Sequence, residues 1–254
     1  MFELNEKIAV ITGSGSGIGK ATALLFAKQG AQVHVIDLNE EACNETVKEI
    51  QQTGGKAVKH VSDVSNQQQV KEVFGKIGRI DILVNSAGIS HIGNAENTTE
   101  SDFDRIYNVN IKGVYNCLHA AVSIMKKNRS GVILNLSSIA NIVGLQVRFA
   151  YSMSKGAVYA MTLSVAKDYL NDDIRCNCVS PARVHTPFVD NFIKKNYPGK
   201  EEEMFEKLSK SQPIGRMAKP EEIASLILFL CSDEASFITG CDYPIDGGST
   251  QLNS

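Results

Sequence analysis

The sequence lacks a surplus of charge of either sign. Its 26 basic and 28 acidic residues leave a formal net charge of −2, and the pI is near 6.2. A protein that attracts nucleic acid by bulk electrostatics needs a basic face. The densest basic cluster, at 126–129, has the pattern of a helix C-terminus instead. We therefore expect no nucleic-acid partner.

The sequence also lacks a long hydrophobic run. The longest strongly apolar stretch, at 223–231, has nine residues, whereas a helix needs about 20 residues to span a membrane. The N-terminal segment, MFELNEK, carries acids and no apolar core of the kind that signal peptides contain. We therefore expect a cytoplasmic protein with no membrane partner.

The cysteines form no zinc-binding pattern. The six cysteines are scattered, no C-x-x-C pair occurs, and no histidine near them completes a ligand set. We expect no metal site and interpret the cysteines as small buried side chains in a reducing compartment.

Short apolar runs alternate along the chain with helical patterns. Strands are predicted at 7–12, 32–36, 57–61, 81–85, 132–136, 174–179 and 242–246. This alternation predicts a doubly wound α/β fold, with a parallel sheet of about seven strands covered by helices on both faces. With no repeat and no linker, residues 1–254 are expected to form a single domain. An unbroken helix is predicted at 101–127.

The segment 181–215 departs from this alternation. It contains Pro187, Pro198 and Pro213, a charge run, and one amphipathic piece at 203–208. We expect an irregular insertion that acts as a substrate lid.

A glycine-rich turn follows the first predicted strand. Gly13, Gly15, Gly17 and Gly19 stand between this strand and a helix, where free backbone N–H groups and the positive helix end suit a pyrophosphate. The spacing fits neither G-x-G-x-x-G nor a P-loop. A plain strand-to-helix turn would need one glycine rather than four, so we favour phosphate binding.

Asp37 ends the second predicted strand, where an acid can hydrogen-bond the adenosine ribose. The same carboxylate would repel a 2′-phosphate, and no arginine follows it within four residues. This predicts NAD rather than NADP.

Tyr151 and Lys155 are four residues apart in a predicted helix, so they share one face. An ammonium close to the phenol would lower the pKa of the tyrosine and allow it to act as a general acid or base. By itself the spacing also fits a surface pair of no function.

Several motifs together resemble the short-chain dehydrogenase/reductase family. Thr12-Gly13-x-x-x-Gly17-Ile18-Gly19 resembles the family's cofactor loop, and residues 85–88 resemble its Asn-Asn-Ala-Gly turn, with Ser86 in place of the second asparagine. Asn110, and Ser138 thirteen residues before Tyr151 and Lys155, match the catalytic positions; Ser180-Pro181 and residues 245–248 match further landmarks. The resemblance covers nearly the whole chain.

This resemblance implies a Rossmann-type, NAD-dependent oxidoreductase for a secondary alcohol or ketone. Tyr151 would exchange a proton with the substrate oxygen, Ser138 would hydrogen-bond that oxygen, Lys155 would lower the Tyr151 pKa and hold the nicotinamide ribose, and Asn110 would support a water that leads to solvent. The implied cofactor contacts are Gly13, Ser16, Gly17, Ile18, Gly19, Asp37, Leu38, Asp63, Val64, Asn85, Ala87, Gly88, Tyr151, Lys155, Pro181, Val184 and Thr186.

Arg148 is the main clue to the substrate. It precedes Tyr151 by three residues, so its guanidinium is expected at the rim of the same site, where it could clamp a carboxylate. Its surroundings resemble the cytosolic 3-hydroxybutyrate dehydrogenase branch, in which an arginine at this position binds the acid. The segment 180–188 resembles bacterial dehydrogenases of sugar acids such as 2-keto-3-deoxy-L-fuconate. We expect an anionic hydroxy acid.

Other polar residues near these motifs have two interpretations. Arg183 follows Pro181-Ala182 where many family members have Pro-Gly. We treat Arg183 and Gln146 as candidate substrate contacts, and His91 and His185 as possible hydroxyl contacts. Arg183 is equally compatible with a salt-bridged or solvated role, and for Gln146, His91 and His185 an ordinary role is favoured.

Two further functional classes stay open. One is an NADPH-type 3-ketoacyl reductase that acts on an acyl carrier, against which Asp37 and the pI argue. The other is a catalytically silent dinucleotide-binding sensor, which would not need Ser138, Tyr151 and Lys155 together. The resemblance also implies a homotetramer or dimer built on the long helices before and after Ser138.

Overall fold

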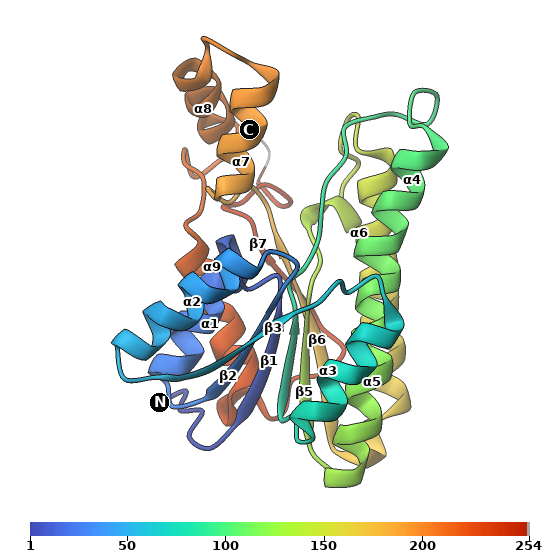
Figure 1. The fold of residues 1–254 in the computed structure, drawn as a ribbon. Helices are drawn as coiled ribbons and strands as arrows, with labels where there is room; N and C mark the ends of the chain where they lie inside the picture. The colour runs from blue at the N-terminus through green and yellow to red at the C-terminus, as the bar shows by residue number, and fades with distance from the viewer. Residues whose placement is uncertain (253–254) are drawn as a thin grey trace.

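Seven parallel strands form one sheet at the centre of the computed structural model, which describes residues 1–252 (Figure 1). The order is β3-β2-β1-β4-β5-β6-β7, so the direction of winding reverses between β1 and β4. The strands are β1 (Ile8–Thr12), β2 (Gln32–Asp37), β3 (Lys56–Val61), β4 (Ile82–Asn85), β5 (Gly131–Leu136), β6 (Ile174–Pro181) and β7 (Asp242–Ile245). The predicted doubly wound α/β fold is confirmed, and ligands of such sheets bind where the winding reverses.

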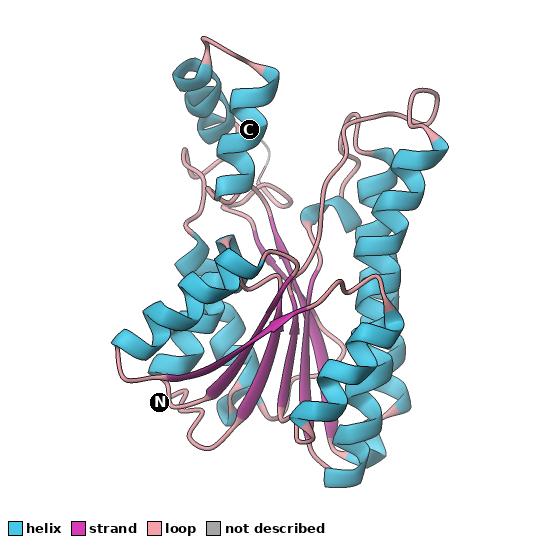
Figure 2. Cartoon of the chain, in the orientation of Figure 1, coloured by secondary structure: helices cyan, strands magenta, loops and turns pink. Residues whose placement is uncertain are grey.

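Helices cover both faces of the sheet (Figures 1 and 2). One face carries α1 (Gly17–Lys28), α2 (Glu40–Gln52) and α9 (Pro220–Cys231), and the other carries α3 (Gln67–Ile77), α5 (Gly113–Asn128) and α6 (Phe149–Asp168). Because both faces are buried, the central strands β1, β4 and β5 are mostly apolar rather than alternating. Within residues 1–252, no helix combines the length and the hydropathy of a membrane span.

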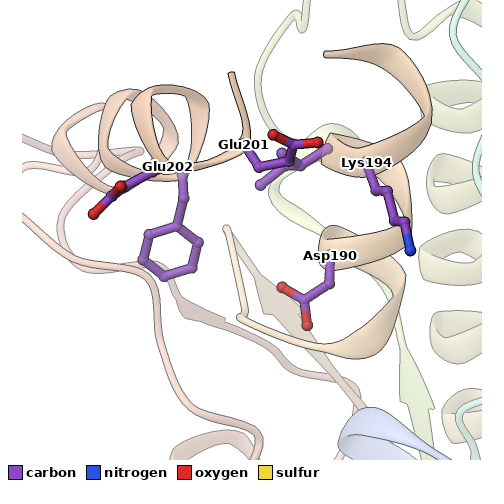
Figure 3. Close-up of a pocket in the computed structure, with 6 residues that line it drawn as sticks. Asp190, Lys194, Glu201 and Glu202 are labelled. Carbon is purple, nitrogen blue, oxygen red and sulfur yellow. The ribbon is translucent and has the colours of Figure 1, made fainter. Parts of the chain in front are cut away.

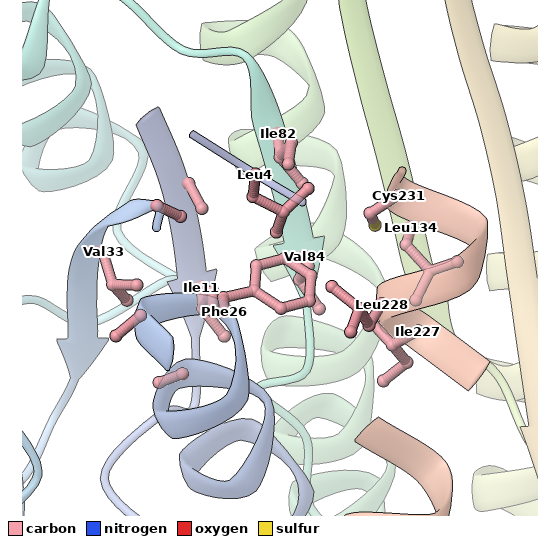
Figure 4. Close-up of a cluster of buried hydrophobic side chains, with 14 of the residues drawn as sticks. Leu4, Ile11, Phe26, Val33, Ile82, Val84, Leu134, Ile227, Leu228 and Cys231 are labelled. Atoms are coloured by element: carbon pink, nitrogen blue, oxygen red, sulfur yellow. The ribbon is translucent and has the colours of Figure 1, made fainter. Parts of the chain in front are cut away.

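Phe26 of α1 shows how one face is packed. Its ring is fully buried and lies among Ile11, Val84 and Leu228, which come from β1, β4 and α9 (Figure 4). Burying such a side chain contributes about 1.5–3 kcal/mol. These contacts attach α1, and therefore the glycine turn before it, to the centre of the sheet.

The helix predicted to run unbroken over 101–127 is interrupted by a π-helical stretch. α4 (Glu100–Ile106) continues into η1 (Tyr107–Lys112), which is π-helical, and then into α5. In a π-helix each N–H bonds to the carbonyl five residues earlier, which accommodates one extra residue. The stretch places the side chain of Asn110 inside the protein, with 1% exposed.

The segment 181–215 is more regular than predicted. Two helices, α7 (Pro187–Asn196) and α8 (Glu201–Lys210), lie beyond the carboxyl ends of β6 and β7 (Figure 1). Pro187 is the first residue of α7, where a missing N–H costs no helical hydrogen bond. The prolines therefore mark helix boundaries here. The amphipathic piece predicted at 203–208 lies within α8, whereas the irregular structure predicted for the residues of α7 was wrong.

Candidate active site

The glycine turn between β1 and α1 is shaped by contacts that exclude side chains. Gly13 and Gly17 have φ of 66° and 54°, a region that favours glycine. A Cβ on Gly19 would overlap the carbonyl oxygen of Gly13, and one on Gly15 would lie 3.0 Å from Cγ of Asp37. Ser16 caps α1 with extended backbone but without a side-chain hydrogen bond. The turn thus presents the N-terminus of α1, as a dinucleotide pyrophosphate requires.

Substituting Gly19 tests this close packing. Gly19→Ala is expected to weaken dinucleotide binding at least tenfold and to lower stability by about 1–3 kcal/mol, because the new methyl group meets backbone rather than a flexible side chain. Calorimetric titration with NAD and denaturant unfolding measure the two effects. Gly75→Ala is the matched control, since Gly75 lies in α3 with open space around its Cβ position; it should be neutral or slightly stabilising. Equal behaviour of the two variants would contradict the assignment.

Asp37 lies beside the glycine turn. Its Oδ2 accepts a hydrogen bond from the Gly15 N–H at 3.0 Å, and its Oδ1 accepts one from the Asn39 N–H at 3.0 Å. The neighbouring Leu38 side chain is 70% exposed. A carboxylate held at this end of β2 can accept hydrogen bonds from ribose hydroxyls.

The predicted adenine contacts lie at the end of β3. Asp63 accepts hydrogen bonds from the N–H and hydroxyl of Ser65, at 2.8 and 2.7 Å. The carbonyl of Val64 accepts one from Asn116 Nδ2 at 2.8 Å, and the Val64 side chain is buried. Asp63 is therefore held by its own turn, and Val64 is fixed against α5.

Thr12 joins the glycine turn to the turn after β4. Its hydroxyl accepts hydrogen bonds from the N–H groups of Ser86 and Ala87, at 3.1 and 3.2 Å. A Cβ on Gly13 would lie 2.7 Å from Cα of Ala87. Sequence reasoning placed Thr12 in the cofactor motif but assigned it no role; its position immediately before Gly13 was the available signal.

Asn85, at the end of β4, is part of a buried polar row. Its Nδ2 donates to Asn135 Oδ1 at 2.8 Å, and Asn135 Nδ2 donates to Thr162 at 2.9 Å. The row ties β4, β5 and α6 together, while the Asn85 Oδ1 atom is buried without a hydrogen-bond partner. Gly88 follows close by, since a Cβ there would lie 3.7 Å from Lys155 Nζ.

The four predicted catalytic residues come together on three elements. Ser138 follows β5, Tyr151 and Lys155 lie on the first two turns of α6, and Asn110 lies in η1. Tyr151 and Ser138 form a side-chain hydrogen bond. Lys155 Nζ donates to the Leu136 carbonyl at 2.7 Å and lies 5.7 Å from the centroid of the Tyr151 ring.

The electrostatics of this group differ from the prediction. Burial raises the pKa of Tyr151, and the Ser138 hydrogen bond and the charge of Arg148 oppose this rise. Burial also lowers the pKa of Lys155 to about 8. Lys155 does not offset this rise in the structure, because its ammonium is directed to the Leu136 carbonyl and desolvation dominates. The predicted lowering of the Tyr151 pKa by Lys155 stays a prediction.

Asn110 connects this group to the turn after β4. Its Oδ1 accepts from the Ile89 N–H at 2.9 Å, while its Nδ2 donates to the Ile89 carbonyl at 2.9 Å and to Ser154 Oγ at 3.0 Å. Its side chain is therefore engaged in holding the turn after β4 against α6. The predicted support of a water stays a prediction.

The start of the lid lies against the cofactor turn. A Cβ on Gly17 would lie 3.3 Å from the methyl group of Thr186. The carbonyl of Pro181 accepts a hydrogen bond from Ser138 Oγ at 3.4 Å, and Val184 is buried in a bridge to Ala218. Thr186 thus lies against the glycine turn and Pro181 against Ser138, whereas Val184 is packed in the hydrophobic core.

Arg148 is the N-cap residue of α6, one turn before Tyr151. Backbone bonds join its neighbours Val147 and Phe149 to Gly93, at 3.0 Å each. Val147 has φ of 52°, a region that β-branched residues rarely adopt. Burial lowers the pKa of the Arg148 guanidinium, and nearby Tyr151 and Tyr197 oppose the fall. A partly desolvated cation therefore lies near enough to Tyr151 to influence its pKa, and the predicted role of Arg148 in binding a carboxylate stays a prediction.

The other substrate candidates are less clearly placed. Arg183 is exposed and donates from Nε to Ser211 at 3.1 Å. Gln146 is exposed. His185 is paired with Asp190 at 2.9 Å, whereas His91 lies 3.7 Å from Asp102 and buries an Nε2 without a hydrogen-bond partner. His185 thus has the ordinary paired role.

A surface hollow of about 450 Å³ lies between α7 and α8 (Figure 3). Its lining residues are Asp190, Ile193, Lys194, Glu201, Glu202 and Phe205. None of the predicted site residues is among them, so the hollow is a feature of the lid. Among residues 1–252, no group of three or more histidine, cysteine or acidic side chains is arranged to hold a metal ion.

Known proteins are similar to this chain in sequence over nearly its whole length. A family model described as enoyl-(acyl carrier protein) reductase matches residues 13–250. The chain is 43% identical over 251 residues to a 3-oxoacyl-(acyl-carrier-protein) reductase of Thermotoga maritima, covering 97% of this chain and 99% of that one. It is 39% identical over 249 residues to dehydrogenase/reductase SDR family member 6 of Xenopus laevis, covering 98% and 99%.

A solved structure agrees over the same extent. L-sorbose reductase from Gluconobacter frateurii, complexed with NADPH and L-sorbose, superposes with a TM-score of 0.94 at 27% identity, covering 99% of each chain. The matched family model spans the glycine turn, Ser138, Tyr151 and Lys155. The chain belongs to the short-chain dehydrogenase/reductase family and is an oxidoreductase of that family.

Proposed function

We propose that this protein transfers a hydride between NAD(H) and a secondary alcohol or ketone on a small hydroxy acid or sugar-derived acid. The observation that carries the proposal is the convergence of Ser138, Tyr151 and Lys155 at one edge of the sheet, with Arg148 one turn before Tyr151 at the start of α6. One substrate oxygen can approach the two hydroxyls while an acid group approaches Arg148. We propose that the whole chain acts as one catalytic unit in the cytoplasm.

The residues present fit a nicotinamide dinucleotide. The glycine turn leaves room where a Cβ would collide, and α1 presents its N-terminus there. Asp37 suits a ribose with free hydroxyls, and Lys155, Thr186 and Asn85 lie toward the nicotinamide end of such a molecule. When bound, the nicotinamide supplies the acceptor or donor of the hydride.

The proton chemistry falls to this chain's own residues. Tyr151 accepts the hydroxyl proton of the alcohol during oxidation and returns it to the carbonyl oxygen during reduction. Ser138 donates a hydrogen bond to the same oxygen and so orients it toward Tyr151. Lys155, charged below its pKa of about 8, provides a positive charge near the phenolate that forms.

Arg148→Ala tests the acid group of the substrate. The variant is expected to lose roughly 2–5 kcal/mol in kcat/KM for the acidic substrate, mostly through KM, because a partly buried charge pair disappears. Steady-state kinetics with the acid and with a neutral alcohol measure the difference. Arg148→Lys should recover part of the loss, since lysine keeps the charge but not the bidentate geometry. A variant with unchanged kinetics on the acid would exclude Arg148 from substrate binding.

A substrate screen tests the proposal as a whole. NAD reduction is followed with 3-hydroxy acids, aldonic acids and 3-deoxy sugar acids, with neutral secondary alcohols for comparison. The proposal expects the fastest turnover on a carboxylate-bearing alcohol. Greatest activity on the neutral alcohols would contradict the anionic substrate, and turnover unaffected by loss of the Tyr151 hydroxyl would contradict the mechanism.

A 3-ketoacyl reductase is the second candidate. It is favoured by the 43% identity to a relative with that name. Its signature would be oxidation of NADPH, in preference to NADH, with acetoacetyl thioesters. Binding of NAD without turnover of any panel member would instead favour a dinucleotide sensor.

We propose that the active form is a homotetramer. Exposed aromatic and apolar side chains lie on η1, α5 and α6, namely Tyr107, Tyr115, Phe149, Tyr159 and Leu163. Such a surface is unusual for a monomer and fits burial by a second copy. Analytical ultracentrifugation measures the assembly directly.

A further inference from the structure

The carboxylate of Asp242 accepts hydrogen bonds from side chains of two segments that lie next to Ser138. It begins β7, and its carboxylate accepts hydrogen bonds from Ser180 Oγ at 2.7 and 2.9 Å, from Asn141 Nδ2 at 2.9 Å and from Cys178 Sγ at 3.3 Å. Ser180 and Cys178 belong to β6, whereas Asn141 follows Ser138 by three residues. These donors are all neutral, and hydrogen bonds to an ionised acceptor are about twice as strong as neutral ones.

Asn141 carries the connection into the catalytic group. Its Nδ2 also lies 3.0 Å from Ser137 Oγ, and Ser137 Oγ donates to the carbonyl of Lys155 at 3.1 Å. A chain of hydrogen bonds therefore runs from Asp242 through Asn141 and Ser137 to the backbone of Lys155. In the sequence, Ser137 and Asn141 lie on either side of Ser138.

Ser180 carries a second connection. It precedes Pro181, whose carbonyl lies 3.4 Å from Ser138 Oγ. Asp242 thus holds both the turn that contains Ser138 and the strand end against which the Ser138 hydroxyl rests. The interaction between the hydroxyls of Ser138 and Tyr151 depends on the relative position of these two segments.

We propose that Asp242 is a positioning residue for the reaction, which sets the place of the Ser138 hydroxyl through Asn141 and Ser180. The inference rests on the proposed function, because the chemistry of Ser138 and Tyr151 is what it supports. A carboxylate is needed at this position because it accepts at both oxygens and donates from neither. An asparagine of the same shape would turn an N–H₂ group toward the same donors.

Asp242→Asn is therefore expected to lower kcat by about 10- to 100-fold, as small misplacements of reacting groups do. KM for NAD should change less than kcat, because Asp37 and the glycine turn, which would hold the adenosine and pyrophosphate, lie outside this chain of hydrogen bonds. The assay uses NAD with the alcohol that the wild-type enzyme oxidises fastest in the screen. Activities are divided by the folded fraction measured by unfolding.

A pH profile separates positioning from loss of structure. The Ser138 hydrogen bond opposes the rise in the Tyr151 pKa, so its loss should raise that pKa further. Oxidation needs the deprotonated phenol, and its kcat in Asp242→Asn should reach half its maximum at a higher pH than in the wild type. Ser138→Ala should shift the profile in the same direction, and the double variant should shift it no further.

Control variants separate an effect on the position of Ser138 from a general loss of stability. Asp81 lies at the opposite end of the strands, and its carboxylate accepts a hydrogen bond from the Ile8 N–H at 2.7 Å. The Asp81→Asn variant should have lower stability and an unchanged pH profile. Asp242→Asn and Asn141→Ala should be non-additive in both kcat and unfolding free energy. An Asp242→Asn enzyme with lowered stability but wild-type kcat and pH profile would overturn the inference. A wild-type enzyme without turnover would contradict the proposed function instead.

Discussion

Replacing Tyr151 by phenylalanine should reduce kcat by about 100- to 10,000-fold, which is the usual contribution of general acid–base catalysis. The phenyl ring preserves the packing of α6 but removes the hydroxyl that pairs with Ser138. Binding of NAD and the free energy of unfolding should remain near the wild-type values. Tyr159→Phe removes an exposed hydroxyl from the same helix and is the matched control. Full turnover by Tyr151→Phe would refute the mechanism.

The direction of the Tyr151 pKa shift predicts how activity depends on pH. Burial raises this pKa, so the phenol is largely protonated at neutral pH and ready to donate to a carbonyl. Oxidation needs the phenolate, and its kcat should still be rising above neutral pH. Reduction should be favoured at lower pH, where Lys155, with a pKa of about 8, is also charged. Rates measured in both directions across the pH range test the sign.

The wild-type enzyme is expected to use NAD with at least about 100-fold higher kcat/KM than NADP. The carboxylate of Asp37, held by the N–H groups of Gly15 and Asn39, would face a 2′-phosphate, and a like-charge contact costs several kcal/mol. Asp37→Ser should narrow the ratio at least tenfold, mainly through better use of NADP. Kinetics with both cofactors at a fixed substrate concentration measure the ratio.

An exposed acid four residues after Asp37 provides the control for this prediction. Glu41→Gln in α2 removes one negative charge near Asp37 without touching the glycine turn. It should leave the cofactor ratio within about twofold, because exposed charges are screened by salt. Equal or better efficiency of the wild type with NADP would show that Asp37 does not set the preference.

The sheet was predictable because its signals are local. Each strand is a short apolar run bounded by polar or glycine-containing turns, and the parallel arrangement follows from the intervening helices. The grouping of Ser138, Tyr151 and Lys155 also follows from sequence, because a strand end and the helix after it must meet at one edge of the sheet. These inferences need no knowledge of distant contacts.

The features that were missed depend on contacts between distant residues. The π-helical stretch at Tyr107–Lys112 has no periodicity signal of its own, and the lid helix α7 is short and begins at a proline. The hydrogen bond from the Lys155 ammonium to the Leu136 carbonyl was missed because helical spacing alone carries no information on the neighbouring strand. Asp242 and Asn141 are 101 residues apart, so no motif links them.

The π-helical stretch η1 sets the rotation of the following helix, α5, about the helix axis. An α-helix advances about 100° per residue, so the one extra residue in η1 rotates α5 by about that angle relative to an uninterrupted helix. The same offset turns Asn110 inward and leaves Tyr115 facing outward, with 1% and 47% exposed. Removing a single residue from this stretch would therefore disturb the interior of the site and the outer face of α5 in one step. The interior of the site and the outer face of α5 therefore depend on the same rotation about the helix axis. An insertion or deletion in η1 would change both.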